Sequence, residues 1–275
     1  MTETTTAPTG PRTDGTPLLS AREVTMRFGG LVAVDKVDFD VYPGEIMGLI
    51  GPNGAGKTTF FNCLTGLYKP TSGTVTFDGT VLPPKPGKVV RAGMARTFQN
   101  IRLFANMTAA ENVMVGRYCR TSSGPLTSII RGPKYRREEN ETRARAEELL
   151  DFVGLPDAAE NLARNLSYGD QRRLEIARAL ATDPKLVLLD EPTAGMNPHE
   201  TRQAEELIFK IRDQGLAVIT IEHDMRFIFN LCDRVLCLVQ GRPLVLGTPD
   251  EVQSDPRVIE AYIGTGAESG EGRDA

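Results

Sequence analysis

The sequence has no tryptophan, only 2 histidines among 275 residues, and no apolar run long enough to cross a bilayer. A transmembrane helix needs about 20 consecutive apolar residues. The N-terminal stretch MTETTTAPTGPRTDGTP also has neither the basic start nor the apolar segment of a secretory signal. We therefore expect a chain that is neither secreted nor self-inserting.

An excess of positive charge is also missing. The chain has 32 Lys and Arg against 36 Asp and Glu, a formal net charge of −4. Proteins that bind nucleic acid through their phosphates usually carry a clustered basic excess. The composition therefore predicts an ordinary globular protein with no nucleic-acid partner.

Cysteine is scarce, and none of the 4 residues stands in a CxxC pair. Cys63, Cys119, Cys232 and Cys237 lie in mixed or apolar stretches, so we interpret them as reduced structural thiols. Reduced thiols are typical of the cytosol.

The two ends of the chain differ from the rest in composition. Residues 1–17 and 265–275 are rich in Thr, Pro, Gly, Ser and charge, and they contain little that could be buried. Such segments cannot offset the entropy of folding, so both are predicted to be disordered tails. The length between them, residues 18–264, suits one substantial domain with a subdomain, or two small domains.

The first half of the chain changes from strand-like to helical patterning. Residues 18–50 alternate between apolar and polar side chains, as strands do, and GTVTFDG at 73–79 is hairpin-like. From Thr108 to about Ala163, apolar residues recur at helical spacing among paired charges. This centre is expected to be a helical insert or subdomain.

The second half carries short, nearly continuous apolar runs. LVLLDEP at 186–192 and GLAVITIEH at 215–223 each follow a helix-like segment, which is typical of parallel strands buried on both faces. A final hairpin at 234–247 is expected to turn at Gln240-Gly241. The fold class is therefore α/β.

The strongest motif is GPNGAGKT, a complete match to G-x-x-x-x-G-K-[ST] placed between an apolar run and a helix-like segment. Its glycines let backbone N–H groups curl around phosphates, and the following helix start adds partial positive charge. Lys57 is expected to reach the β- and γ-phosphates, and Thr58 to give its hydroxyl to Mg²⁺. The expected nucleotide-binding residues of the loop are Gly51, Pro52, Asn53, Gly54, Ala55, Gly56, Lys57, Thr58 and Thr59.

A second set of polar residues follows the later apolar runs. Asp190 ends the LVLLD strand, where it could hold the shell of Mg²⁺, and the adjacent Glu191 could polarise a water for attack on the γ-phosphate. Alone, this pair would be an acidic surface feature. His223 could bond a γ-phosphate oxygen, although a lone histidine is more often structural, and His199 is expected near an exposed helix start. Gln99 could bond Mg²⁺ or water, or be a simple loop residue.

The stretch NLSYGDQRRLEIARAL begins with a second possible anion site. Ser167 and Gly169 precede a polar run in the manner of a helix start. Ser167 and Asp170 also fit the capping box [ST]-x-x-[DE], which would only satisfy the free N–H groups of that helix. Taken alone, the capping interpretation is the better one, but it does not account for the motifs that accompany this stretch.

In this order, the motifs closely resemble those of the ATP-binding subunits of ABC transporters. Residues 51–58 resemble the Walker A loop, Gln99 the Q-loop glutamine, 166–171 the signature, 186–191 the Walker B strand with its catalytic glutamate, and His223 the switch histidine. The resemblance covers roughly the whole of the folded region defined above.

This resemblance implies a P-loop NTPase core of the RecA type, an antiparallel β subdomain, and a helical subdomain at about 100–180 that carries the signature. It implies ATP and Mg²⁺ as cofactors, with Phe28 stacking on adenine. It also implies that two ATPase subunits pack head to tail, so that Ser167 and Gly169 meet ATP held on the other subunit. The implied catalytic residues are Lys57, Gln99, Glu191 and His223, and the implied metal ligands are Thr58, Gln99 and Asp190.

Departures from the general pattern indicate a subfamily. Tyr168 replaces a signature glycine, Asp170 a glutamine and Asn197 an aspartate. With the VIEAYIG ending and a basic insert at about 119–138, they resemble ATPases of branched-chain amino acid importers. That resemblance implies a separate membrane permease, an extracytoplasmic substrate-binding protein and a place on the inner face of the cell membrane. The ATPase of a lipid-type exporter is the alternative; a soluble ABC ATPase or a P-loop kinase fits less well.

Overall fold

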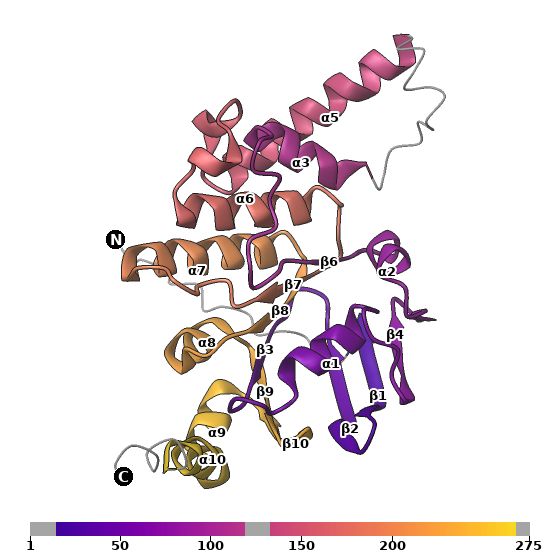
Figure 1. Ribbon diagram of the computed structural model, residues 1–275, viewed down its shortest axis with the longest axis vertical. Helices are drawn as coiled ribbons and strands as arrows, with labels where there is room; N and C mark the ends of the chain where they lie inside the picture. Colours follow the sequence, from indigo (N-terminus) through magenta and orange to yellow (C-terminus); the bar gives the residue numbers. More distant parts are fainter. Residues whose placement is uncertain (1–14, 119–132, 268–275) are drawn as a thin grey trace, which may run out of the picture.

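The structure is a computed structural model that describes residues 15–118 and 133–267. Two β-sheets and a layer of helices make up the described part (Figure 1). The predicted tails lie outside it apart from residues 15–17 and 265–267, and most of the insert at 119–138 lies outside it as well.

The smaller sheet is antiparallel, with the strand order β2-β1-β4-β5. Strands β1 (Leu19–Phe28) and β2 (Leu31–Val41) alternate buried with more exposed residues, so one face packs on the core. Strands β4 (Ser72–Phe77) and β5 (Thr80–Val81) form the hairpin expected from GTVTFDG.

The larger sheet has the order β10-β9-β3-β8-β7-β6, and all its neighbours are parallel except the β9–β10 hairpin. Every residue of β3, β7 and β8 is buried, which explains their unbroken apolar sequences. The hairpin turns at Gln240 and Gly241, both with positive φ, as predicted. The strands are β3 (Ile46–Ile50), β6 (Met94–Arg96), β7 (Leu186–Asp190), β8 (Ala217–Ile221), β9 (Arg234–Val239) and β10 (Arg242–Gly247).

Helices cover both faces of the larger sheet. Helix α1 lies between the two sheets, where Phe60 packs edge-to-face on Phe39 of β2, with ring centroids 5.5 Å apart (Figure 1). The opposite face carries the second core cluster. The helices around the sheets are α1 (Lys57–Leu64), α2 (Pro86–Ala92), α7 (Pro198–Asp213), α8 (Met225–Leu231), α9 (Pro249–Ser254) and α10 (Pro256–Ala267).

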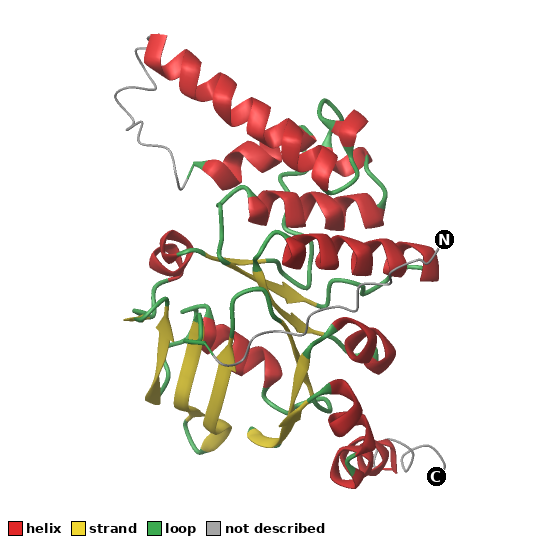
Figure 2. Cartoon of the chain, turned by 180° about the vertical axis from the view of Figure 1, so that it is seen from behind, coloured by secondary structure: helices red, strands yellow, loops and turns green. Residues whose placement is uncertain are grey.

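The remaining helices gather at one end of the molecule, above the sheets in both views (Figures 1 and 2). They are α3 (Ala109–Arg117), α5 (Pro133–Phe152) and α6 (Tyr168–Leu180), joined by 3-10 turns at Pro156–Ala158 and Ala163–Asn165. Their shared core holds Val113, Leu150 and Leu174. Across the described ranges, no helix combines the length and apolar character needed to span a membrane.

Candidate active site

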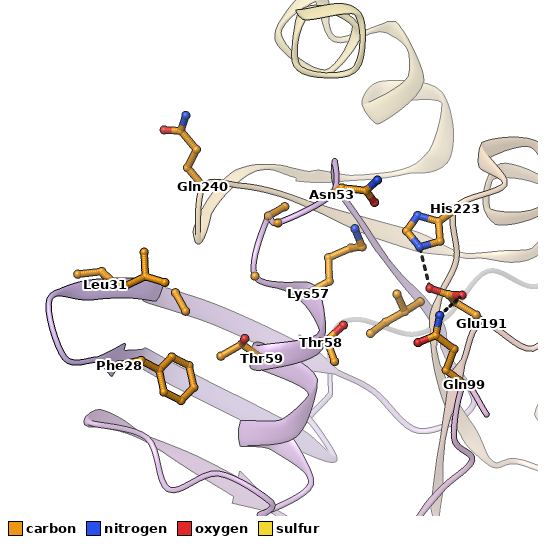
Figure 3. Close-up of a pocket in the computed structure, with 16 residues that line it drawn as sticks. Phe28, Leu31, Asn53, Lys57, Thr58, Thr59, Gln99, Glu191, His223 and Gln240 are labelled. Atoms are coloured by element: carbon orange, nitrogen blue, oxygen red, sulfur yellow. Dashed lines mark hydrogen bonds and ion pairs between the residues drawn. The ribbon is translucent and has the colours of Figure 1, made fainter. Parts of the chain in front are cut away.

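A pocket of about 650 Å³ opens at the carboxyl ends of β3, β7 and β8 (Figure 3). Parallel sheets commonly bind ligands at this edge, because the loops that follow the strands meet there. The pocket contains most of the predicted nucleotide residues, and Gly51 and Pro52 lie buried behind it. It is lined by Phe28, Leu31, Val32, Ala33, Asn53, Gly54, Ala55, Gly56, Lys57, Thr58, Thr59, Gln99, Glu191, Ile221, His223 and Gln240.

The loop between β3 and α1 is pressed against neighbouring strands, which explains two of its glycines. Gly51 has φ 148°, and a Cβ there would lie 2.1 Å from the Leu238 carbonyl oxygen. Gly56 has φ 94°, and its Cβ would lie 2.3 Å from the Ala33 carbonyl oxygen. A side chain at either position would displace the loop, so only glycine permits this path.

The start of α1 has free backbone N–H groups that can bind an anion. Its N-cap, Gly56, has no side chain to satisfy the first N–H groups, and the first turn has no acidic residue. Lys57 is buried, and its Nζ donates to the carbonyl oxygens of Gly51 (2.6 Å) and Pro52 (3.0 Å). Burial lowers the Lys57 pKa, and the nearby Glu191 carboxylate opposes that change. A bound phosphate would add negative charge beside this buried ammonium.

Glu191, the first residue after β7, contacts Gln99 from the loop after β6 and His223 from the loop after β8 (Figure 3). Its carboxylate accepts a hydrogen bond from Gln99 Nε2 at 2.7 Å, and its other oxygen lies 2.7 Å from His223 Nε2. The backbone of Glu191 is left-handed, with φ 49°, a strained conformation often found at functional sites. The structure therefore places two of the predicted catalytic residues, Gln99 and His223, on the carboxylate of a third, Glu191, a group able to accept a proton from water.

Asp190 has a partner that sequence reasoning missed. Arg96 Nη2 lies 2.8 Å from Asp190 Oδ2, and its Nη1 donates to Asn62 Oδ1 at 2.6 Å. The guanidinium also sits 4.8 Å from the centre of the Phe61 ring. Arg96 is the last residue of β6 and pairs with Leu188 of β7, a neighbour relation that the sequence alone did not reveal.

The predicted Mg²⁺ ligands offer oxygen atoms only, the donor type this cation prefers. They are the Thr58 hydroxyl, the Gln99 amide and the Asp190 carboxylate. Because the Gln99 NH₂ group is bound to Glu191, its amide oxygen is left as the atom for a cation (Figure 3). The described residues contain no cluster of three or more His, Cys, Asp or Glu for a metal. Thr58 and Gln99 line the pocket, whereas the Asp190 carboxylate is buried and ion-paired with Arg96. The first two residues fit a cation that takes its other ligands from phosphate and water.

Phe28 lies at the rim of the pocket, on the side away from Glu191 (Figure 3). Phe28 is 44% exposed and meets Tyr68 edge-to-face, with centroids 5.6 Å apart and planes at 79°. The exposed Phe28 face can stack on a planar base, as predicted for adenine.

The signature residues lie outside this pocket. Ser167 is the N-cap of α6 and accepts a hydrogen bond from Asp170 N at 3.2 Å, so the capping interpretation is correct for Ser167. The Asp170 carboxylate turns instead to Arg173. A Cβ on Gly169 would lie 2.9 Å from Glu200 Oε1, which places the signature against the start of α7.

A buried arginine links the signature to the Q-loop, a contact that sequence reasoning missed. Arg172 donates to the carbonyl oxygens of Phe98 (2.7 Å) and Gln99, and to the Tyr168 hydroxyl (2.9 Å). The Tyr168 ring also lies 3.3 Å from where a Cβ on Gly195 would be. Tyr168 therefore contacts the segment before α7 directly and the Q-loop through Arg172. The spacing i, i+4 of Tyr168 and Arg172 was the available signal.

Two further polar residues hold the segment between β7 and α7. Buried Glu222 accepts hydrogen bonds from Thr193 N (2.8 Å) and Thr193 Oγ1 (2.6 Å), a contact that the sequence did not predict. Asn197 caps α7 by accepting from His199 N (2.9 Å) and Glu200 N (3.0 Å). His199 is exposed in the first turn, as expected.

Fold and pocket together define a P-loop nucleotide-hydrolysing protein. A profile of the ABC transporter family matches residues 34–194, and one described as branched-chain amino acid ATP-binding cassette transporter matches residues 242–268. The chain belongs to the ABC transporter family, and it is an ATP-binding ATPase.

Individual relatives agree with this assignment over nearly their whole length. The chain is 47% identical to the high-affinity branched-chain amino acid transport ATP-binding protein LivG of Escherichia coli K12, covering 90% of this chain and 98% of LivG. The ADP conformation of MJ1267, an ATP-binding cassette of an ABC transporter, superposes with a TM-score of 0.80 at 31% identity, covering 91% of this chain and 100% of MJ1267. A dimeric post-hydrolysis state of the ATP-binding cassette MJ0796, bound to ADP and Pi, gives 0.70 at 26% identity, covering 84% and 98%. These neighbours confirm the predicted P-loop fold.

Proposed function

We propose that this chain is the ATPase subunit of an importer for branched-chain or related amino acids. The observation that carries this proposal is the match of residues 242–268 to the branched-chain profile, supported by 47% identity to LivG. The described part of this match, residues 242–267, comprises β10, α9 and α10 with their connections, outside the motifs shared by ABC ATPases in general.

We assign ATP to the pocket, with its base on Phe28 and its phosphates on residues 51–59. When ATP binds, the Lys57 ammonium exchanges its hydrogen bonds to the Gly51 and Pro52 carbonyls for contacts with the β- and γ-phosphates. Thr58, Gln99 and Asp190 hold Mg²⁺, which when bound neutralises charge on the phosphates.

Glu191 accepts the proton of the attacking water, and this geometry supports that role. Its carboxylate is held from both sides by Gln99 and His223. His223 can then contact the γ-phosphate, because its side chain is half exposed at the pocket. Positioning and electrostatic complementarity are the main contributions a protein makes to phosphoryl transfer.

The chain works with partners. A second ATPase subunit, identical or related, places its Ser167 and Gly169 against the ATP of the first, an arrangement supported by the dimeric relative MJ0796. A separate permease and an extracytoplasmic substrate-binding protein complete the importer, and the ATPase sits on the inner face of the membrane. We assign residues 18–264 to the ATPase domain, with its helical subdomain at about 100–180.

Uptake in a deletion strain lacking redundant importers tests this proposal. Import of labelled leucine, isoleucine and valine should fall, and should return with the wild-type chain but not with Lys57→Ala. Unchanged uptake of all three would overturn the branched-chain assignment, and an accompanying envelope-lipid defect would favour a lipid-type exporter.

A further inference from the structure

After the last strand, the C-terminal segment contacts the start of the P-loop. Helices α9 and α10 lie beside β9 and β10 (Figure 1). The Tyr262 hydroxyl of α10 accepts a hydrogen bond of 2.7 Å from the backbone N–H of Gly51, a residue 211 positions away. The start of the P-loop therefore has a partner from the opposite end of the chain.

Gly51 needs a partner from outside the sheet. Strand β3 ends at Ile50, whose pairing with Cys237 is the last between β3 and β9. A buried N–H without an acceptor is costly, so the first amide beyond the strand must find one elsewhere. The Gly51 carbonyl is held by Lys57 Nζ, and its N–H by the Tyr262 hydroxyl. Both polar groups of this one residue are thus occupied.

The element that presents Tyr262 is firmly packed. Val252 of α9 and Val258 of α10 are buried in the core cluster on that face of the sheet. Thr248 begins α9 with a complete capping box, and Asp255 at the junction accepts a hydrogen bond of 2.8 Å from Arg257 N. A hydroxyl carried by such an element can fix the position of the amide that it contacts.

Burial raises the pKa of the Tyr262 hydroxyl. The phenol therefore stays protonated and neutral at physiological pH, and it contacts Gly51 as a neutral oxygen acceptor.

We propose that Tyr262 is a positioning residue of the ATP site, which fixes Gly51 and thereby the path of the P-loop. The inference rests on the proposed nucleotide site and gives the C-terminal segment a role in ATP affinity. Loss of the hydroxyl should loosen the first residue of the loop without touching the groups around Glu191. The effect is expected on ATP binding rather than on the chemical step.

The test compares Tyr262→Phe with Tyr42→Phe in the full chain. Each change removes one phenolic oxygen and keeps the ring. Tyr42 precedes β3 at the end away from the P-loop, and its ring lies 5.7 Å from the Arg234 guanidinium carbon. Three quantities are measured: the Kd of Mg-ATP by calorimetry, the KM and kcat of ATP hydrolysis, and the hydrogen exchange rate of the Gly51 amide.

In Tyr262→Phe we expect Kd and KM for ATP to rise about 3- to 10-fold, as for loss of one net hydrogen bond, with kcat within about 2-fold. The Gly51 amide should exchange faster, and Tyr42→Phe should match the wild type. A folded Tyr262→Phe protein with wild-type Kd and KM would overturn the inference, even if its melting temperature fell. Absence of ATP binding to the wild type would instead overturn the nucleotide site and the inference with it.

Discussion

Two helix starts of this molecule carry anion-binding motifs. They differ in whether side chains of the protein already bond the free N–H groups of the first turn. Helix α1 begins at Gly56 with no side-chain cap and no acidic residue in its first turn. Helix α6 begins at Ser167, whose hydroxyl accepts a backbone N–H, and it carries Asp170 in its first turn. Lys57 of α1 is 7% exposed, whereas Tyr168 of α6 is 45% exposed.

The difference indicates what each start can bind. The α1 start lines a pocket of its own chain, and no side chain caps its first N–H groups, so these groups can bind phosphate. The first N–H groups of α6 are partly satisfied by Ser167, and this helix start lies outside that pocket. A phosphate would reach it only when another molecule brings one, which is the arrangement proposed for the ATPase pair. The following substitutions test this division, from the largest expected effect to the smallest.

Lys57→Ala removes the only cation that lines the pocket, among the described residues. We expect ATP turnover to be lost by more than about 100-fold, with much weaker ATP binding, because the phosphates lose a direct ionic partner. Steady-state hydrolysis and calorimetry measure both losses. Lys88→Ala, at an exposed lysine of α2, is the matched control and should leave both unchanged.

Glu191→Gln keeps the shape of the side chain but removes its basicity. Turnover should fall about 10²- to 10⁴-fold, the usual contribution of a general base, while ATP binding stays near wild type. The variant should accumulate as an ATP-dependent dimer, seen by light scattering. Glu206→Gln, on the exposed face of α7, serves as control, and wild-type turnover in Glu191→Gln would contradict the assigned role.

Ser167→Arg and Ser167→Ala separate the two roles of the α6 start. Loss of the cap in the alanine variant should cost about 0.5–2 kcal/mol of stability and lower the melting temperature modestly. The arginine variant should also block ATP-dependent closure, because its bulk stands where the other subunit's phosphate must approach. Its own P-loop should bind ATP normally. Normal closure with a lowered melting temperature would show that capping is the whole role of Ser167.

Tyr168→Phe is the substitution at the α6 start with the smallest expected effect. The hydroxyl accepts from Arg172, which also holds the Q-loop carbonyls. Its loss should reduce turnover about 2- to 5-fold and leave the Kd of ATP unchanged. Tyr42→Phe is again the control. A rise in the Kd of ATP equal to the fall in turnover would show instead that Tyr168 acts on ATP binding.

The sequence predicted those features whose physical causes are local. Phosphate binding demands glycines, a lysine and a hydroxyl within one short loop, so residues 51–58 could be recognised directly, and buried parallel strands require unbroken apolar runs such as residues 186–190. The functional role of Gln99 was expected only from the family resemblance, and its hydrogen bond to Glu191 was not predicted.

The contacts that were missed join distant segments. Arg96 and Asp190 are 94 positions apart, Arg172 and Gln99 are 73 apart, and Tyr262 and Gly51 are 211 apart. Nothing in the spacing of these residues fixes such pairs, because they depend on how the sheet, the helical layer and the C-terminal helices pack together.

The most direct test of the division between the two helix starts is sedimentation of the Glu191→Gln chain with ATP, alone and with the ATPase subunit that copurifies from native membranes. The account predicts that ATP converts the 30.0 kDa chain into a pair. It also predicts that adding Ser167→Arg to this chain abolishes pairing of the chain with itself while the chain still binds ATP. Pairing that survives Ser167→Arg, or that forms equally without nucleotide, would contradict the claim that the second helix start completes the ATP site of another chain.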